Sequence, residues 1–113
     1  ISFVKLASYV GTSSTGSVCE MIGLNVDISG RDVVVVEDIV DSGLTMKYVT
    51  EMLAKYNPRS ISICILLLKP GNLKVDLDIP YKCFSIPNDF ILGYGLDYDG
   101  YGRNTRDIYT VVE

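Results

Sequence analysis

Histidine is absent from the 113 residues of this chain. Its absence excludes Ser-His-Asp and Cys-His nucleophile systems and every metal site that needs an imidazole ligand. Positive charge is not in excess either, because 10 Lys and Arg residues stand against 14 Asp and Glu residues. We therefore expect no nucleic-acid partner. The longest apolar run, Ile63–Leu68, is far shorter than the roughly 20 residues that span a bilayer, so we expect no membrane partner.

Cysteine is scarce as well, and the three present are Cys19, Cys64 and Cys83. No Cys-x-x-Cys pair occurs, so neither a zinc site nor a thioredoxin-type site is expected. The odd number, with one cysteine inside an apolar run, favours reduced and mostly buried thiols in a cytoplasmic protein. The side chains left for chemistry are Asp and Glu, supported by Lys, Arg, Ser, Thr and Tyr.

Length and composition are typical of one globular domain, residues 1–113, with 48% hydrophobic and 21% charged residues. The sequence begins without Met, and Ile1–Ala7 already alternates apolar and polar residues at the spacing of a strand. We expect this sequence to be the C-terminal part of a longer chain.

The pattern further along predicts an α/β fold with a mostly parallel sheet. Four consecutive valines, Val33–Val36, are typical of a strand buried on both faces, and Ser60–Leu68 is a second β-rich run. Between them lie an acidic loop, Glu37–Gly43, and a helix that Asn57-Pro58 ends. The apolar face of that helix comprises Met46, Val49, Met52, Leu53 and Tyr56.

Shorter segments flank this β-loop-α-β unit. Ser8–Ser17 holds two Gly and six Ser or Thr residues and is predicted to be a loop. Cys19–Ile28 is predicted to be a strand or an irregular edge, and Lys82–Ile86 and Ile108–Val112 are predicted to be short strands. Phe90–Arg106 combines four Gly with three Tyr, which is an unusual composition.

The acidic loop stands where open α/β sheets bind ligands, just beyond the carboxyl end of a strand. The following helix offers unpaired N–H groups and the positive end of its dipole, which suit a phosphate. Gly43 permits close approach of the backbone, and Ser42 and Thr45 can donate from hydroxyl groups. The lysine of a Walker A loop and the G-x-G-x-x-G pattern of dinucleotide-binding folds are both missing.

Glu37 and Asp38 would repel a phosphate, but carboxylates accept hydrogen bonds from neighbouring hydroxyls such as those of a ribose. The segment therefore predicts a sugar-phosphate cradle, with the acids on the 2′ and 3′ hydroxyls and the helix N-terminus on the 5-phosphate. A plainer alternative is that Asp38 and Asp41 are loop carboxylates that only favour the start of a helix.

Four motifs carry a resemblance to a known family. The string VVVVEDIVDSGLT, with its core at 37–45, resembles the phosphoribosyl-diphosphate motif of type I phosphoribosyltransferases. The strings LLLKP (Leu66–Pro70) and IPNDFILGYGLDYDGYGRN (Ile86–Asn104) resemble the hypoxanthine-guanine branch of that family. SYVGTSSTG, within residues 8–17, is similar to that branch's flexible catalytic loop. The similarity runs from residue 1 to residue 113 and implies the Rossmann-like fold of the family, truncated at its N-terminus.

The resemblance implies a role for each residue of the 37–45 motif. Glu37 and Asp38 would hold the ribose hydroxyls, and Asp41 would lie near N7 of a purine as a general base or acid. The residues implied for the 5-phosphate loop are Ser42, Gly43, Leu44 and Thr45. Leu44 departs from the family pattern, because some members carry a lysine at this position.

The resemblance also implies a base site and a metal site outside that motif. Lys69 would donate to the 6-oxo group of the purine, Phe90 would stack on its face, and Ile91 would offer backbone groups to its edge. Arg103 would bind the diphosphate. The Mg²⁺ ligands implied are Asp97, Glu37 and Asp38. The catalytic loop would close over the site through Ser8 and Tyr9 and exclude water.

Each of these residues also has a plain structural interpretation when it is considered alone. Lys69 ends a strand and could be solvated, and Phe90 and Ile91 could be ordinary core residues. Asp97 and Arg103 could lie on the exposed surface. Tyr9 could simply pack beside the first strand. It is the joint order and spacing of these residues that favours the functional interpretation.

The function implied is transfer of a 5-phosphoribosyl group from 5-phosphoribosyl 1-diphosphate to hypoxanthine or guanine, giving IMP or GMP and diphosphate, with Mg²⁺. The family resemblance further implies a homodimer or homotetramer for the full-length protein. Alternatives are a regulatory protein that senses the sugar diphosphate, or a transferase for another 6-oxopurine such as xanthine. Family members carry an N-terminal part with a Lys-Gly loop that contacts diphosphate, so we expect the 113-residue chain alone to be weakly active or inactive.

Overall fold

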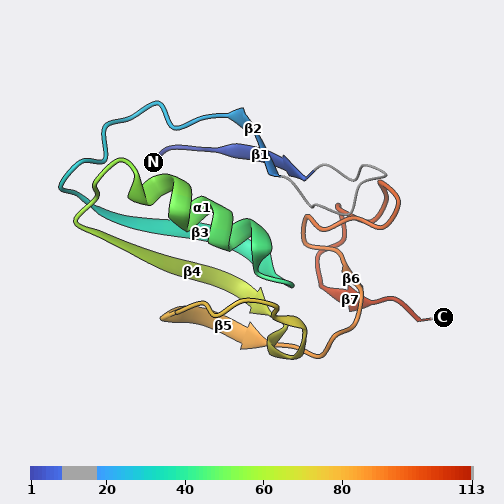
Figure 1. Ribbon diagram of the computed structural model, residues 1–113. Coiled ribbons are helices and arrows are strands. Elements are labelled where there is room, and N and C mark those ends of the chain that lie inside the picture. Colours follow the sequence, from blue (N-terminus) through green and yellow to red (C-terminus); the bar gives the residue numbers. More distant parts are fainter. Residues whose placement is uncertain (9–17, 113) are drawn as a thin grey trace.

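Figure 1 shows a computed structural model of the chain, which describes the backbone of residues 1–8 and 18–112 and the side chains of residues 1–6 and 23–112. Its elements are β1 (Lys5–Ser8), β2 (Val18–Ile22), β3 (Asp32–Val40), α1 (Leu44–Ala54), β4 (Ser60–Leu68), the 3-10 turn η1 (Pro70–Asn72), β5 (Tyr81–Ser85), β6 (Ile91–Leu92) and β7 (Tyr109–Thr110). No helix within these ranges is long and apolar enough to cross a membrane.

A three-stranded parallel sheet in the order β3-β4-β5 forms the centre of the structure. The register between β3 and β4 runs from Asp32 opposite Ser60 to Val40 opposite Leu68. Two antiparallel pairs, β1–β2 and β6–β7, flank this sheet (Figure 1). The predicted α/β fold with a mostly parallel sheet is therefore confirmed.

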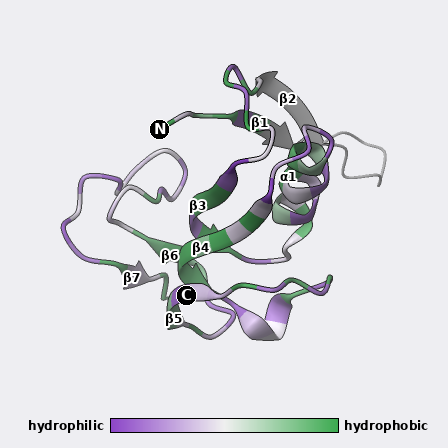
Figure 2. Cartoon of the chain, turned by 90° about the vertical axis from the view of Figure 1, so that its left-hand side faces the viewer, coloured by the Kyte–Doolittle hydropathy of each residue, from purple (hydrophilic) through white to green (hydrophobic). Residues whose placement is uncertain are grey.

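The hydrophobic core lies between the sheet and α1, and β3 and β4 carry hydrophobic stretches along their length (Figure 2). The helix contributes its predicted face, because its buried residues are Met46, Val49, Met52 and Leu53. Tyr56 was wrongly included in that face, since α1 ends at Ala54 and the tyrosine is 46% exposed. The chain turns away at Asn57, which has a positive φ of 56°.

The prediction that Val33–Val36 would be buried on both faces is wrong. Val33 and Val35 pack against the core, but Val34 and Val36 are 55% and 74% exposed. The reason is that α1 and the core cover only one face of β3, and no helix covers the other face within the described residues.

The predicted acidic loop is shorter than expected. Residues 37–40 continue β3, because Glu37, Ile39 and Val40 stay in register with β4. Only residues 41–43 remain as the connection to α1. Glu37 and Asp38 therefore lie near the end of β3 and not in a loop.

Smaller differences concern the cysteines and the ends of the short strands. Cys64 is half-buried and Cys83 is exposed, so the expectation of mostly buried thiols is wrong for Cys83. The predicted strands at 1–7, 19–28, 82–86 and 108–112 all exist as shorter or shifted elements, namely β1, β2, β5 and β7. The length of each strand depends on its hydrogen bonds to a neighbouring strand. The alternation of apolar and polar residues in one segment does not show where those bonds begin and end.

Candidate active site

The parallel register brings the candidate residues to one end of the sheet. Val40 lies opposite Leu68, so the residues that follow the two strands, Asp41 and Lys69, come side by side. The backbone N–H of Lys69 donates to the carbonyl of Val40 at 3.0 Å. The N-terminus of α1 opens at the same end, and the β6–β7 segment lies beyond it (Figure 1).

A cavity of about 270 Å³ occupies this end of the sheet. Residues of a single sequence segment line it: Glu37, Asp38, Ile39, Val40, Asp41, Ser42, Gly43, Thr45 and Met46. The segment predicted to cradle a sugar phosphate therefore does enclose a space, at the carboxyl end of a strand and at the start of a helix.

The start of α1 leaves backbone donors available. Gly43 adopts a φ of 85°, and a Cβ there would come within 3.0 Å of the Leu77 and Val75 side chains. The hydroxyl of Ser42 accepts the N–H of Leu44 at 3.4 Å, a weak contact. No side chain caps the helix, and the N–H groups of Thr45 and Met46 find no acceptor among the described residues. These donors suit an anion.

Glu37 and Asp38 end the exposed part of β3 and both line the cavity. Glu37 remains exposed to solvent as a whole residue, but partial desolvation of its carboxyl first and the neighbouring Asp38 second raise its pKa to about 7. The carboxylate of Asp38 accepts the N–H of Ile39 at 2.7 Å. Two crowded acids of this kind favour hydroxyl donors or a cation over an anion.

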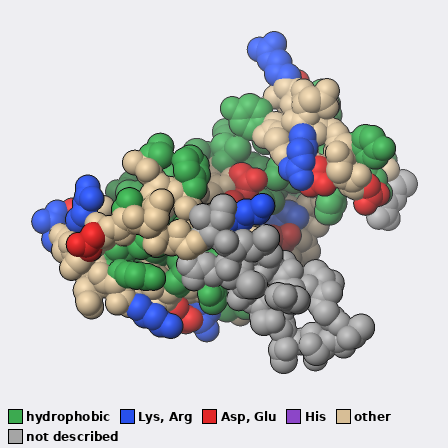
Figure 3. Space-filling view, turned by 90° about the horizontal axis from the view of Figure 1, so that it is seen from above, with side chains coloured by type: hydrophobic (Ala, Val, Ile, Leu, Met, Phe, Trp, Pro, Cys, Tyr) green, Lys and Arg blue, Asp and Glu red, His purple; other side chains and the backbone are tan. Residues whose placement is uncertain are grey.

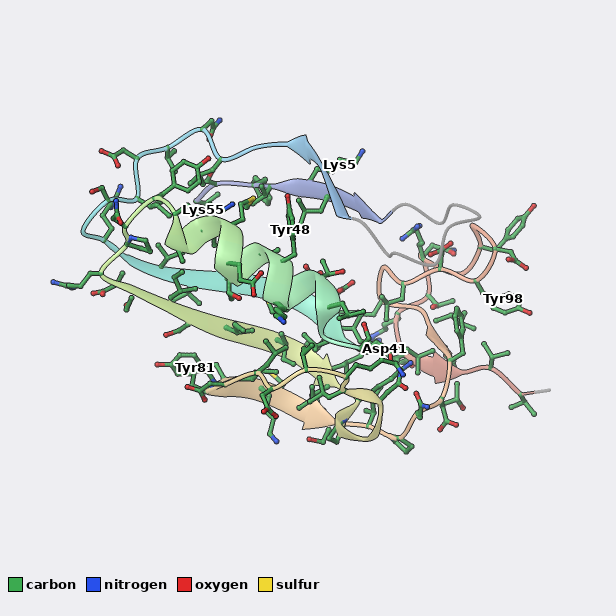
Figure 4. The ribbon with its side chains drawn as sticks, viewed as in Figure 1. Lys5, Asp41, Tyr48, Lys55, Tyr81 and Tyr98 are labelled. Atoms are coloured by element: carbon green, nitrogen blue, oxygen red, sulfur yellow. The ribbon has the colours of Figure 1, made fainter. Side chains whose placement is uncertain are left out.

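Lys69, Asp41 and Asn72 form the most connected group of side chains at the site. Lys69 is 6% exposed, and its Nζ donates to Oδ2 of Asp41 at 3.1 Å. The amide Nδ2 of Asn72 donates to Oδ1 of the same carboxylate. Asn72 first and Lys69 after it hold the pKa of Asp41 below its ordinary value, against the opposing effect of burial. Asp41 lies at the end of the sheet nearest the β6–β7 segment (Figure 4).

The plain interpretation of Lys69 as a solvated lysine is therefore wrong. Phe90 is not a core residue either, because it is 58% exposed and meets the Tyr98 ring edge-to-face at 5.7 Å. Ile91 does fit the core interpretation, since it is 8% exposed in β6. An exposed aromatic face next to a buried residue with extended backbone is compatible with a platform for a planar ring.

Asp97 and Arg103 are bound to one another in the loop between β6 and β7. Arg103 Nη2 lies 3.1 Å from Oδ1 of Asp97, and its Nη1 donates to the carbonyl of Gly95 at 2.7 Å. The second oxygen of Asp97 accepts the N–H of Gly100 at 2.9 Å. The two side chains brace a glycine-rich loop and still lie on the surface, since the Arg103 side chain is 62% exposed and that of Asp97 is 38% exposed.

A family model described as a phosphoribosyl transferase domain matches residues 1–99. The chain belongs to the phosphoribosyltransferase family.

Individual phosphoribosyltransferases extend this result. The chain is 47% identical over 110 residues to hypoxanthine-guanine phosphoribosyltransferase of Mycobacterium tuberculosis (strain ATCC 25618 / H37Rv), which covers 96% of this chain and 54% of the relative. The Aquifex aeolicus enzyme of the same name is 38% identical over 114 residues, covering 100% and 64%. A crystal structure of a hypoxanthine-guanine phosphoribosyltransferase from Bacillus anthracis superposes with a TM-score of 0.89 at 41% identity, covering 97% and 65%. The chain thus spans about half to two thirds of the length of these relatives.

A metal ion bound to this phosphoribosyltransferase chain would need ligands from a bound substrate as well as from the protein. Within the described ranges, no three Asp, Glu, Cys or His side chains gather closely enough to hold an ion. Mg²⁺ is commonly held by one or two carboxylates together with substrate phosphates and water. The adjacent acids Glu37 and Asp38 fit that arrangement. On the face shown in Figure 3, acidic and basic side chains lie close together near the middle.

The structure does not describe two of the predicted site residues, and it adds one residue that the sequence did not indicate. Ser8 ends β1, but its side chain and all of Tyr9 lie outside the described residues. Asn72 was not singled out from the sequence, although it touches Asp41. The available signal was its place in the Lys69–Asn72 turn, directly after the strand that delivers Lys69.

Proposed function

We propose that this chain forms the phosphoribosyl-binding and base-binding part of an enzyme that acts on 5-phosphoribosyl 1-diphosphate and hypoxanthine or guanine. The products would be IMP or GMP and diphosphate. The observation that carries the proposal is the cavity whose entire lining comes from residues 37–46, with the uncapped start of α1 at its wall. The kinship with hypoxanthine-guanine phosphoribosyltransferases supports the choice of substrates.

The sugar phosphate would use both parts of the cavity. The backbone N–H groups at the start of α1, with the hydroxyls of Ser42 and Thr45, would hold the 5-phosphate beside Gly43 and Leu44. Glu37 and Asp38 would accept hydrogen bonds from the 2′ and 3′ hydroxyls. This division places negative charge on the helix dipole and neutral hydroxyls on the acids.

The purine would be recognised at the end of β4. Lys69 would donate to the 6-oxo group, which accepts hydrogen bonds, whereas the 6-amino group of adenine donates them and would be rejected. As N9 attacks C1′ and the bond from C1′ to the diphosphate oxygen breaks, the proton on N7 would pass to the carboxylate of Asp41. A regulator that only sensed the sugar diphosphate would need no buried cation here, so Lys69 favours the enzyme.

The other expected residues complete the proposed site. Phe90 would stack on the purine, and Ile91 would offer its backbone to the ring edge. Arg103 would release Asp97 or share it when it meets the diphosphate. The 8–17 segment, through Ser8 and Tyr9, would exclude water from the reacting carbon.

Glu37 and Asp38 would hold Mg²⁺ together with the substrate, and Asp97, which does not gather with them, would reach Mg²⁺ separately from the β6–β7 loop. Its chemistry when bound is to neutralise charge on the departing diphosphate. The full-length protein, if it is as long as these relatives, would form a homodimer or homotetramer. Residues 1–113 would make up a single partial domain of it.

The binding of GMP in the presence of Mg²⁺ tests this proposal directly. Calorimetry on the 113-residue chain should detect binding, and Lys69→Ala should weaken it by roughly tenfold or more, since a charge-assisted hydrogen bond contributes about 1.5–3 kcal/mol. Lys74→Ala is the matched control, because it removes an exposed lysine on the same connection. AMP should bind more weakly than GMP to the wild-type chain.

The same titrations can contradict the proposal. Absence of GMP binding to the wild-type chain, or equal binding to the Lys69 and Lys74 variants, would remove the base site from the mechanism. Folding of each variant is checked by its thermal unfolding curve.

A further inference from the structure

The turn after β4 is closed by one backbone hydrogen bond and tied to the β3–α1 connection by another. The N–H of Asn72 donates to the carbonyl of Lys69 at 3.1 Å and closes η1. Two residues later, the N–H of Lys74 donates to the carbonyl of Ser42 at 2.9 Å. These backbone hydrogen bonds fix the position of the Asn72 backbone, from which its half-buried side chain extends.

From this turn, the amide of Asn72 reaches one oxygen of Asp41 while Lys69 reaches the other. A carboxylate held at both oxygens by donors from different residues has a fixed plane, whereas one donor alone would let it rotate. Lys69 is the only ammonium in this arrangement, and Asn72 is neutral. Asn72 therefore adds orientation without adding charge.

We propose that Asn72 is a positioning residue for Asp41. It keeps one carboxylate oxygen from turning onto Lys69, so that the carboxylate does not form a two-oxygen pair that would occupy the lysine. The inference deepens the proposed function and rests on it in one respect: Asp41 and Lys69 are taken to meet the purine.

Few charged groups face Asp41 among the side chains that the structure describes. Lys69 contacts it directly from the end of β4, and Glu37 and Asp38 line the same cavity from β3. The lowered pKa of Asp41 agrees with the geometry, because the hydrogen bonds from Asn72 and from Lys69 both favour the ionised carboxylate.

The test measures the pKa of Asp41 itself, by carbon NMR of its carboxyl group in the 113-residue chain. Asn72→Ala should raise this pKa above the wild-type value, and Asn72→Asp should raise it further, since the new acid keeps the shape of the amide but repels Asp41. Asn72→Gln, which keeps a donor, should restore part of the shift. Asn88→Ala is the matched control, because it removes an exposed amide elsewhere.

An Asp41 pKa that is the same in the alanine and aspartate variants as in the Asn88 control would overturn the inference. Unfolding curves identify any variant that fails to fold, and the glutamine variant then decides alone. GMP titration of the same samples separates the proposed role of Asn72 from the proposed function.

Loss of GMP affinity in Asn72→Ala, with affinity retained in the Asn88→Ala control, supports a role of Asn72 in base binding. No GMP binding to any sample would refute the proposed function, while the pKa comparison still decides the role of Asn72.

Discussion

At the scale of single residues, the pair formed by Lys69 and Asp41 is uneven. The Lys69 side chain is 7% exposed, but that of Asp41 is 47% exposed. A buried ammonium depends on its partner, because its own hydration has been lost. Without Lys69, the half-exposed carboxylate of Asp41 would still be hydrated and would still accept the hydrogen bond from Asn72. Removal of the two partners should therefore have unequal consequences.

Asp41→Asn should lower the free energy of unfolding by roughly 1–3 kcal/mol, since it leaves a buried charged donor without its anion. Lys69→Met should cost less than about 1 kcal/mol, because an apolar chain of similar length fills the site and the remaining acid is half-hydrated. Urea unfolding of both variants measures the difference. The reverse order would mean that Lys69 finds other hydration or another partner in the folded chain.

The pH dependence of the same comparison follows from the lowered pKa of Asp41. Its pKa in the folded chain lies below the ordinary 3.8, so the folded state binds the proton less readily than the unfolded state. The stability contributed by the ionised group is complete above that ordinary value and is lost as the pH falls through the folded pKa. The stability gap between wild type and Asp41→Asn should therefore be constant near neutral pH and shrink in acid. A gap that grows in acid would contradict the lowered pKa.

At the scale of elements, the β6–β7 segment depends on Gly93. This glycine has a φ of 100°, and a Cβ there would collide with the carbonyl oxygen of Asp107 and the hydroxyl of Thr105. Gly95 has nearly the same φ, 99°, but open space around it. Gly93→Ala should therefore destabilise the segment by about 1–3 kcal/mol more than Gly95→Ala, which carries only the conformational cost.

Amide exchange in β6 and β7 measures this prediction. Faster exchange confined to these strands is expected in Gly93→Ala, and near-native exchange in Gly95→Ala. Equal acceleration in both variants would show that the positive φ alone, and not the close approach to Asp107, sets the requirement for glycine.

Local signals predicted some elements well and others poorly. Ser60–Leu68 was predicted with its observed bounds, because a long β-rich run closed by Lys69-Pro70 is unambiguous. The extension of β3 through Glu37 was missed, since two acids look like a loop until the facing residues of β4 are known. The cavity segment was predicted because it is contiguous in sequence. The bond from Asn72 to Asp41 joins residues 31 positions apart, and only the register of β3 on β4 brings them together.

At the scale of the whole molecule, the parallel sheet is covered on one side only within the described residues. α1 packs over Val33 and Val35, while Val34 and Val36 remain exposed on the other side of β3. Parallel sheets are usually covered on both faces. A groove of about 460 Å³ also lies along β3 beside the N-terminal segment. An apolar face of this kind promotes association between molecules.

Replacement of both exposed valines by threonine, Val34→Thr with Val36→Thr, should therefore reduce self-association and the binding of a hydrophobic dye. Threonine keeps the β-branched shape that suits a strand, so the free energy of unfolding should change by no more than about 0.5 kcal/mol per site. The matched control, Val33→Thr with Val35→Thr, places hydroxyls against the core and should cost more than about 1 kcal/mol per site. Sedimentation velocity and urea unfolding measure the two effects. Equal destabilisation by both pairs would show that the outer face of β3 is covered in solution, and the exposed valines would then mark an interface already filled.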